Sequence, residues 1–254
     1  MLLLITDTSG KDGFVGLVRA EEGTEPDKVE VIEEVPLAGG TFSAQLVPQI
    51  AALLKKHEFL KTDIDAFVVV SGPGSFTGLR VGLAAIKALA EILQKPIVPV
   101  SLLEVLARYG HGIAAGDEAV QQVTFRYAVA LDAGRKEAFV GQYEIVSASK
   151  TSHSFKCIAE SLLDMRSLAE LVESGASQWI ATPDRAIADA LKKRLGASQE
   201  HAIWDRVQRP RSAEIASVGW DKLRTGETVS PEQLEANYIR RSVAEIYSKP
   251  ASSA

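Results

Sequence analysis

Apolar residues in the first hundred positions follow strand and helix spacings in turn, and they predict a mixed sheet covered by helices. Short runs rich in β-branched residues predict strands, whereas apolar residues three and four positions apart predict helices. The predicted strands run from the N-terminus to Asp7 and over Phe14–Arg19, Val29–Leu37, Ala66–Val70 and Ile97–Val100. The predicted helices are Ser43–Glu58, with Pro48 making its opening irregular, and Ser75 to about Leu93. This order is typical of an α/β fold.

The stretch from Val68 to Leu93 combines a strand, a glycine-rich turn and a long helix. Gly72 and Gly74 allow a turn that most residues disfavour, and Ser75 is suited to cap the helix that follows. The spacing matches neither a P-loop, nor a dinucleotide-binding G-x-G-x-x-G, nor a G-x-S-x-G nucleophile elbow. We interpret the glycines as shaping the turn, with anion binding by exposed amides at the helix start as the alternative.

The long helix carries two apolar faces, although a surface helix of a monomer needs only one. The bulkier face consists of Phe76, Leu79, Leu83, Ile86, Ala90 and Leu93. The opposite face is smaller and smoother, and it consists of Val81, Ala84, Ala85, Ala88 and Ile92. This second face must contact either another part of the chain or another protein, and both alternatives stay open.

The rest of the chain is predicted to form a second half built like the first. A loose, glycine- and alanine-rich piece at Gly110–Ala119 follows a helix at Leu102–Tyr109. Asp132–Gly141 then matches Asp7–Gly16 without a gap in an Asp, a Lys, an acidic residue, Phe, Val and Gly. Further elements are expected at His153–Glu160, Met165–Glu173, Trp179–Ala181, Asp184–Leu195 and Ser212–Thr225.

These patterns predict a first domain at 1–109, a second at 110–247 whose last segment packs back on the first, and a disordered tail at 248–254. A duplicated hairpin that begins with Asp resembles the layout of the actin, sugar-kinase and Hsp70 ATPase superfamily. That resemblance implies two RNase-H-like halves with a cleft between them. In the superfamily, such aspartate-bearing turns hold a metal and nucleotide phosphates, and here they would carry Asp7 and Asp132.

Composition narrows the function classes. The 254 residues are 46% hydrophobic and 24% charged, as in ordinary globular proteins, and no stretch is apolar over the length of a membrane span. The net charge of -5 disfavours a large nucleic-acid footprint. The single cysteine, Cys157, excludes an internal disulfide and fits a reducing compartment. The N-terminal apolar run is too short for a signal peptide, so a cytoplasmic location is expected.

Side chains that could carry catalysis are sparse. The four histidines, His57, His111, His153 and His201, lie far apart, and none forms the i, i+4 pair of a helical metal site. We interpret the first two as solvated and Cys157 as buried filler. The arginines close to Trp204 are interpreted as a solvated face or partner contact, with RNA contact as the alternative. They are Arg206, Arg209 and Arg211.

The sequence GPGSFTGLRVG at Gly72–Gly82 closely resembles the signature of the bacterial TsaB (YeaZ) family. ITDTS near the start, LDAGRKEAFVGQYE in the second half and Tyr238-Ile239-Arg240 support this resemblance, which spans nearly the whole chain. Two positions depart from it. Phe42 stands where many members carry histidine, and Ala236 stands where many carry proline.

The resemblance implies a non-catalytic subunit that activates TsaD, which adds the threonylcarbamoyl group to adenosine beside the anticodon of certain tRNAs. It implies TsaD and the ATPase TsaE as partners, a homodimer when alone, tRNA contact through the complex, and no cofactor of its own. Metal and ATP would belong to the partner subunits. We predict that the partner interface is the smoother face of the long helix together with residues of the Ser43–Glu58 helix: Thr77, Arg80, Val81, Ala84, Ala85, Ala88, Ile92, Leu46 and Ile50. Candidate nucleotide or anion contacts are Asp7, Ser75 and Asp132.

Two other function classes are alternatives to this subunit. One is a free-standing ATPase or small-molecule kinase that uses Asp7 and Asp132 in the cleft. The other is a metallopeptidase, which the lack of paired metal ligands disfavours.

Overall fold

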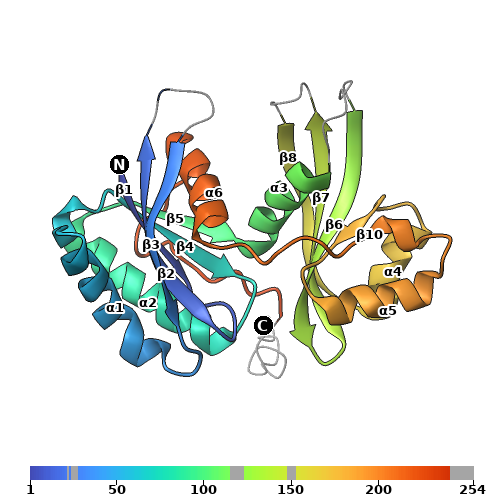
Figure 1. The fold of residues 1–254 in the computed structure, drawn as a ribbon, viewed down its shortest axis with the longest axis horizontal. Helices are drawn as coiled ribbons and strands as arrows, with labels where there is room; N and C mark the ends of the chain where they lie inside the picture. The colour runs from blue at the N-terminus through green and yellow to red at the C-terminus, as the bar shows by residue number, and fades with distance from the viewer. Residues whose placement is uncertain (22, 24–27, 115–122, 148–152, 241–254) are drawn as a thin grey trace, which may run out of the picture.

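A computed structural model describes residues 1–21, 23, 28–114, 123–147 and 153–240. The chain forms two five-stranded sheets with a layer of helices between them and another helical layer outside each sheet (Figure 1). None of the helices in the described ranges combines the length and the hydropathy that a membrane span requires.

The first sheet has the strand order β3-β2-β1-β4-β5. Its strands are β1 (Leu2–Asp7), β2 (Gly13–Glu21), β3 (Lys28–Leu37), β4 (Ala66–Gly72) and β5 (Ile97–Ser101). The first three strands are antiparallel, whereas β4 and β5 run parallel to β1. Helices α1 (Phe42–Lys56) and α2 (Phe76–Leu93) cover its outer face and pack on alternate strand residues such as Leu4 and Val69.

The second sheet has the order β10-β9-β6-β7-β8. Its strands are β6 (Val123–Gly134), β7 (Glu137–Ser147), β8 (His153–Asp164), β9 (Ile180–Ala181) and β10 (Ile203–Trp204). Read from β8, this order repeats that of the first sheet, and the antiparallel and parallel pairings repeat as well. Helices α4 (Met165–Glu173) and α5 (Arg185–Leu195) cover its outer face.

The central layer consists of α3 (Leu102–Ala114) and α6 (Ser212–Arg224). Its core joins both sheets, because Leu3 and Ile5 of β1 and Tyr127 and Val129 of β6 belong to one cluster. The segment after α6 returns to the first sheet, where the Val229 amide donates to the Ile97 carbonyl at 2.8 Å. The prediction of an α/β fold with two halves built alike is confirmed.

Several predicted boundaries are wrong. Helix α3 continues to Ala114 through part of the piece predicted to be loose, because an established helix tolerates a glycine such as Gly110 at about 1 kcal/mol. Helix α1 begins at Phe42 and ends at Lys56 instead of spanning Ser43–Glu58, and Pro48 lies inside it as predicted. β8 extends to Asp164 because its last residues still pair with β7. β10 and two short 3-10 turns, at Lys61–Asp63 and Glu200–Ala202, are additional elements. The predicted tail at 248–254 lies outside the described residues.

Candidate functional site

Three glycines spaced four residues apart let the β1–β2 turn lie directly on the backbone of α2. A Cβ atom on Gly74 would lie 2.3 Å from the Ser9 carbonyl oxygen, and one on Gly78 would lie 2.1 Å from the Thr8 carbonyl oxygen. A Cβ atom on Gly82 would lie 2.2 Å from the Thr8 hydroxyl. No side chain fits at such distances, so packing requires the glycines of the GPGSFTGLRVG motif.

Helix α2 begins at a capped turn. Gly72 has a φ of 139°, which favours glycine, and the Ser75 amide donates to the Ser9 carbonyl at 2.7 Å. The Ser75 hydroxyl accepts a hydrogen bond from the Gly78 amide at 3.3 Å, which confirms its role as N-cap. The hydroxyl therefore has a structural role, and an anion contact at Ser75 stays a prediction.

The outer face of α2 is open to solvent. Leu79, Leu83, Ile86 and Ala90 are buried against the sheet, as predicted for the bulkier face. On the smoother face Ala84 and Ala88 are exposed, Val81 and Ala85 are half-buried, and Ile92 is 70% exposed. Thr77 and Arg80 are exposed beside them. Among the described residues, the smoother face is therefore covered only in part: Val81 and Ala85 pack on the core of the first half, whereas Ala84, Ala88 and Ile92 remain open to solvent.

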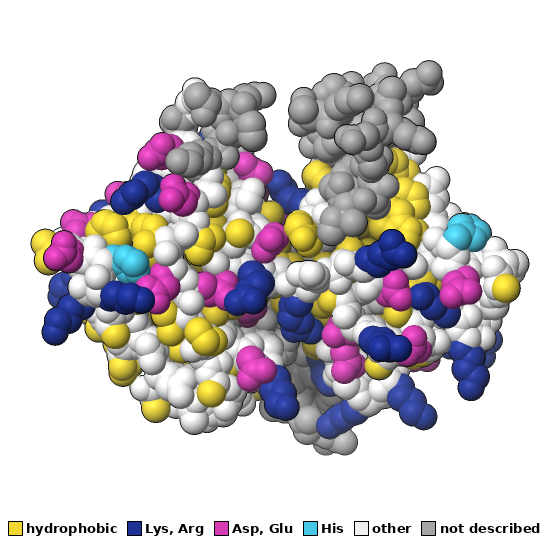
Figure 2. Space-filling view, viewed as in Figure 1, with side chains coloured by type: hydrophobic (Ala, Val, Ile, Leu, Met, Phe, Trp, Pro, Cys, Tyr) yellow, Lys and Arg dark blue, Asp and Glu magenta, His cyan; other side chains and the backbone are white. Residues whose placement is uncertain are grey.

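Two predicted interface residues on the neighbouring helix α1 are buried, so their prediction is wrong. Leu46 is 1% exposed and Ile50 is 4% exposed, because both point from α1 into the core beneath it. The outward face of α1 instead carries Ala44, Val47, Pro48 and Ala51. Figure 2 shows hydrophobic side chains scattered over the lower part of the first half, where Figure 1 places α1 and α2. We call the exposed apolar residues of both helices the outer helical face.

An aromatic and cationic cluster lies at the start of α2. The Arg80 guanidinium stacks over the Phe76 ring at 3.7 Å, and its Nε donates to the Tyr238 hydroxyl at 3.2 Å. The rings of Phe76 and Tyr238 lie 4.8 Å apart. Phe76 is therefore half-exposed in this cluster instead of buried with the bulkier face of α2.

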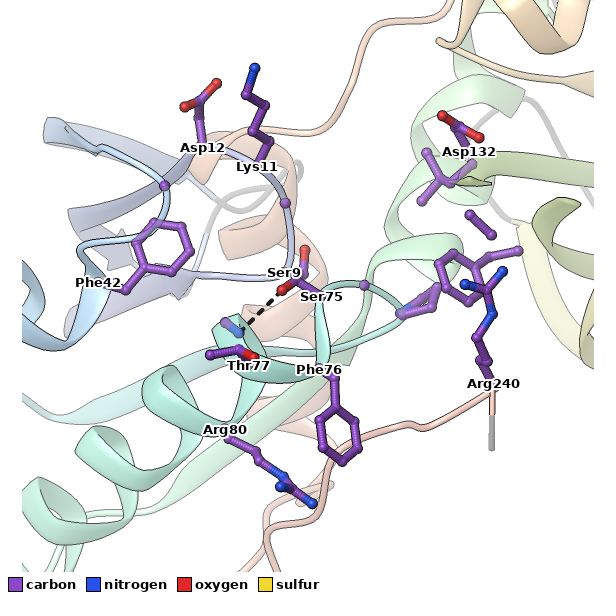
Figure 3. A pocket seen from close by; sticks show the side chains of 18 of the residues that line it. Ser9, Lys11, Asp12, Phe42, Ser75, Phe76, Thr77, Arg80, Asp132 and Arg240 are labelled. Atoms are coloured by element: carbon purple, nitrogen blue, oxygen red, sulfur yellow. Dashed lines mark hydrogen bonds between the residues drawn. The ribbon is translucent and has the colours of Figure 1, made fainter. Parts of the chain in front are cut away.

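A cleft of about 1300 Å³ lies between the two halves and ends at the first turn of α2 (Figure 3). Its lining includes Ser9, Lys11 and Ser75 from the first half and Asp132 and Arg135 from the second. Five cationic and three acidic side chains line it, although the whole chain has a net charge of -5. The cleft is therefore locally positive. This arrangement confirms the predicted cleft between the halves.

The two equivalent aspartates differ in their access to this cleft. The Asp7 side chain is buried, and its carboxylate accepts a hydrogen bond from the Ser9 amide at 2.8 Å. Burial raises the pKa of Asp7, and the Ser9 hydrogen bonds and the Arg209 charge offset this only in part. Asp132 is exposed and accepts a hydrogen bond from the Gly134 amide at 2.8 Å.

This contrast tests whether the two aspartates fit a metal or nucleotide phosphates. Asp7 does not fit, because its enclosed carboxylate is held by its own turn and does not line the cleft. Its predicted contact with a nucleotide or anion is corrected accordingly. Asp132 does line the cleft, so its contact stays a prediction. Among the described residues, no three His, Cys, Asp or Glu side chains are grouped as metal ligands would be.

The remaining candidate residues have other surroundings than expected. His57 is not simply solvated, since its Nε2 lies 2.6 Å from a Glu33 carboxylate oxygen. Cys157 is exposed and is therefore not buried filler. The predicted basic cluster is divided, because Arg209 lies 3.6 Å from Asp184 and Arg211 pairs with Glu34. The side chains of His111 and His153 lie outside the described residues.

The sequence predicted that the last segment packs back on the first domain, but not which contacts it makes with α2. Tyr238 is 158 positions from Arg80 in the sequence, so no local pattern could predict their hydrogen bond. The one available signal was the Tyr238-Ile239-Arg240 segment, which carries part of the family resemblance.

Residues 36–247 match the protein-family model described as TsaD: tRNA N6-adenosine threonylcarbamoyltransferase. The chain belongs to this family. It is 25% identical over 249 residues to the tRNA threonylcarbamoyladenosine biosynthesis protein TsaB of Bacillus subtilis, with 96% of each protein covered. It is also 25% identical over 207 residues to the protein of the same name from Escherichia coli, covering 79% of this chain and 81% of that protein.

Solved structures of the same fold agree with this placement. The structure titled YeaZ from Pseudomonas aeruginosa superposes with a TM-score of 0.65 at 22% identity and covers 93% of this chain and all of that chain. The predicted resemblance to the TsaB (YeaZ) family is thus confirmed, and so is the expected two-lobed, RNase-H-like fold.

Proposed function

We propose that this protein takes part in the biosynthesis of threonylcarbamoyladenosine in tRNA as a non-catalytic subunit that binds and activates TsaD. The names of its TsaB relatives support the pathway. The single structural observation that supports the subunit role is the outer helical face, where small apolar residues of α2 lie exposed. Ala84 and Ala88 leave room for a facing helix to approach closely and pack its side chains between them.

The proposed docking surface is the outer helical face extended by Thr77 and Arg80. A second copy of this chain would occupy the same surface when TsaD is absent, because an isologous contact needs only a self-complementary patch. The ATPase TsaE and tRNA would join through the assembled complex, in the cytoplasm. The metal and ATP would be held by the partner subunits, and this chain would need no cofactor of its own.

A charged residue on the outer helical face tests the proposal. Ala88→Glu should bury an unpaired charge in the contact, which costs several kcal/mol, about 3 or more, and lowers affinity for TsaD at least ~100-fold. Ala84→Arg should act in the same way. The melting temperature of each variant alone should hardly change, because the new side chain points into water. The measurements are calorimetry with purified TsaD and a thermal melt of the variant.

Ala186→Glu is the matched control, since Ala186 is an exposed alanine on the equivalent outer helix α5 of the second half. It should bind TsaD as the unmodified chain does. Unchanged affinity in Ala88→Glu and Ala84→Arg would refute the proposed surface. A large loss of melting temperature would show that the face is part of the core.

A further inference from the structure

Glu160 of β8 joins the two halves of the molecule through one carboxylate. Its Oε1 atom accepts hydrogen bonds from the Ser101 hydroxyl at 2.5 Å and from the Tyr143 hydroxyl at 3.0 Å. Its Oε2 atom accepts from the side-chain amide of Asn237. Tyr143 belongs to the second sheet, whereas Ser101 ends β5 of the first sheet. The carboxylate therefore spans the boundary between the halves.

Ser101 and Asn237, the two hydrogen-bond partners of Glu160 outside the second sheet, both adjoin the turn that precedes α2. The backbone amide of Asn237 donates to the Ser71 carbonyl at 2.7 Å, and the backbone carbonyl oxygen of Asn237 lies 2.7 Å from where a Cβ of Gly72 would stand. Ser101 pairs with Gly72 across the β4–β5 ladder. The turn is therefore held from two sides by residues that Glu160 itself holds.

The next residue along the C-terminal segment extends this contact to α2 itself. Tyr238 packs on Phe76 and accepts the hydrogen bond from Arg80, and both of these residues belong to the first two turns of the helix. A chain of direct contacts thus runs from β8 of the second half to the start of the helix that carries the outer helical face.

We infer that Glu160 is a positioning residue for α2: from the second half, it sets the position of the first turn of this helix. A carboxylate suits this task because its two oxygens can accept several hydrogen bonds at once. Tyr143 is buried, and burial together with the nearby Glu160 charge raises its pKa, so its hydroxyl remains a donor at neutral pH. Removing the carboxylate would leave three donors without this acceptor.

Hydrogen exchange of the isolated chain tests the inference without any partner. In Glu160→Ala, the amides of Ser75, Gly78 and Leu79 should exchange about tenfold faster, equivalent to ~1.4 kcal/mol of lost local protection. The Lys95 amide, bonded to the Ala90 carbonyl at the far end of α2, should keep its rate. General destabilisation by the substitution would instead accelerate both ends of the helix together.

Two further variants make the test specific. Glu144→Ala removes a carboxylate that pairs with Arg126 inside the second sheet, so the start of α2 should keep its rates. The double variant Glu160→Gln with Asn237→Asp exchanges the amide and carboxylate between the two positions, so their hydrogen bond can form with reversed polarity. It should restore slow exchange. The inference would be overturned if the Gly78 and Leu79 amides of Glu160→Ala exchanged at the rates seen in Glu144→Ala. It would also be overturned if the double variant did not restore slow exchange.

The consequence for TsaD affinity rests on the proposed function. Glu160→Ala should weaken binding of TsaD by roughly tenfold, because the misplaced first turn must be reordered in the complex. Normal affinity in Ala88→Glu would refute the docking surface, while the exchange rates would still decide the role of Glu160. Fast exchange at the start of α2 with unchanged TsaD affinity would restrict Glu160 to positioning within the free chain and refute its effect on docking.

Discussion

The two halves share a strand order but differ in the helices outside each sheet. In the first half, α1 and α2 have 15 and 18 residues, and small apolar side chains are exposed on α2. In the second half, α4 and α5 have 9 and 11 residues, and α5 exposes mainly charged side chains such as Arg185, Asp189 and Lys193. A charged outer surface is suited to water, whereas an exposed apolar face is suited to a partner.

The turns that follow β1 and β6 also differ between the two halves. Asp7 is enclosed by its own turn, which the glycines of α2 hold against that helix, whereas Asp132 is open to the cleft. The first half thus combines a tightly packed turn with an open outer face. The two halves thus share one topology but differ in the surfaces built on it.

The largest effect is expected where the first half packs most closely. Gly78→Ala should lower the free energy of unfolding by ~3 kcal/mol or more, because the new Cβ would clash with the rigid backbone of Thr8. Gly110→Ala on α3 is the matched control, since its Cβ would lie 3.5 Å from Val207, an ordinary contact. It should be neutral or stabilising by up to ~1 kcal/mol. Denaturant unfolding measures both, and equal stabilities would show that the turn adapts freely.

A smaller effect is expected from the cap of α2. Ser75→Ala should cost ~1 kcal/mol of unfolding free energy, because the Gly78 amide loses its hydrogen-bond acceptor. Ser75→Asn should keep most of the stability, since asparagine caps helices as well as serine does. The comparison is made by thermal melting of the two variants. If both lose the same stability, the hydroxyl has a role other than capping.

Local patterns predicted the fold well because each of its signals is short-range. The continuous apolar run of β1, the cap at Ser75 and the two faces of α2 all follow from residues within one element. The gapless match of Asp7–Gly16 with Asp132–Gly141 then predicted the duplication, because both stretches carry the same residue types at the same turn and strand positions.

The site was predicted only in part because several of its contacts join distant segments. The helical spacing already put Leu46, Ile50 and Leu53 on one side of α1, and that side is the buried one, so the error was to include Leu46 and Ile50 in the partner interface. Neither the burial of Asp7 nor the cluster around Glu160 has a local signal. The Asn237 contact joins residues 77 positions apart.

The smallest expected effect is a pH-dependent change in melting temperature that replacing Asp7 should cause and replacing Asp132 should not. The pKa of Asp7 is raised by burial, so the folded state holds its proton more tightly than the unfolded chain does. This tighter proton binding stabilises the folded state. The stabilisation is fully present below the pKa of about 3.9 that Asp7 has in the unfolded chain, and it is lost as pH rises through the higher pKa of the folded state. At neutral pH the unmodified chain therefore carries the cost of a buried charge.

Asp7→Asn removes this charge but keeps an oxygen to accept the Ser9 amide. The variant should melt above the unmodified chain at pH 7, by roughly 2–4 °C for each kcal/mol gained, and the difference should vanish as pH falls toward 4. Asp132→Asn should stay within about 0.5 kcal/mol at both pH values, because its side chain is exposed. Melting curves of the three proteins at pH 4 and pH 7 make the comparison. A lower melting temperature for Asp7→Asn at pH 7 would mean that the Asp7 carboxylate, attracted by Arg209, stabilises the turn as an ion despite its burial.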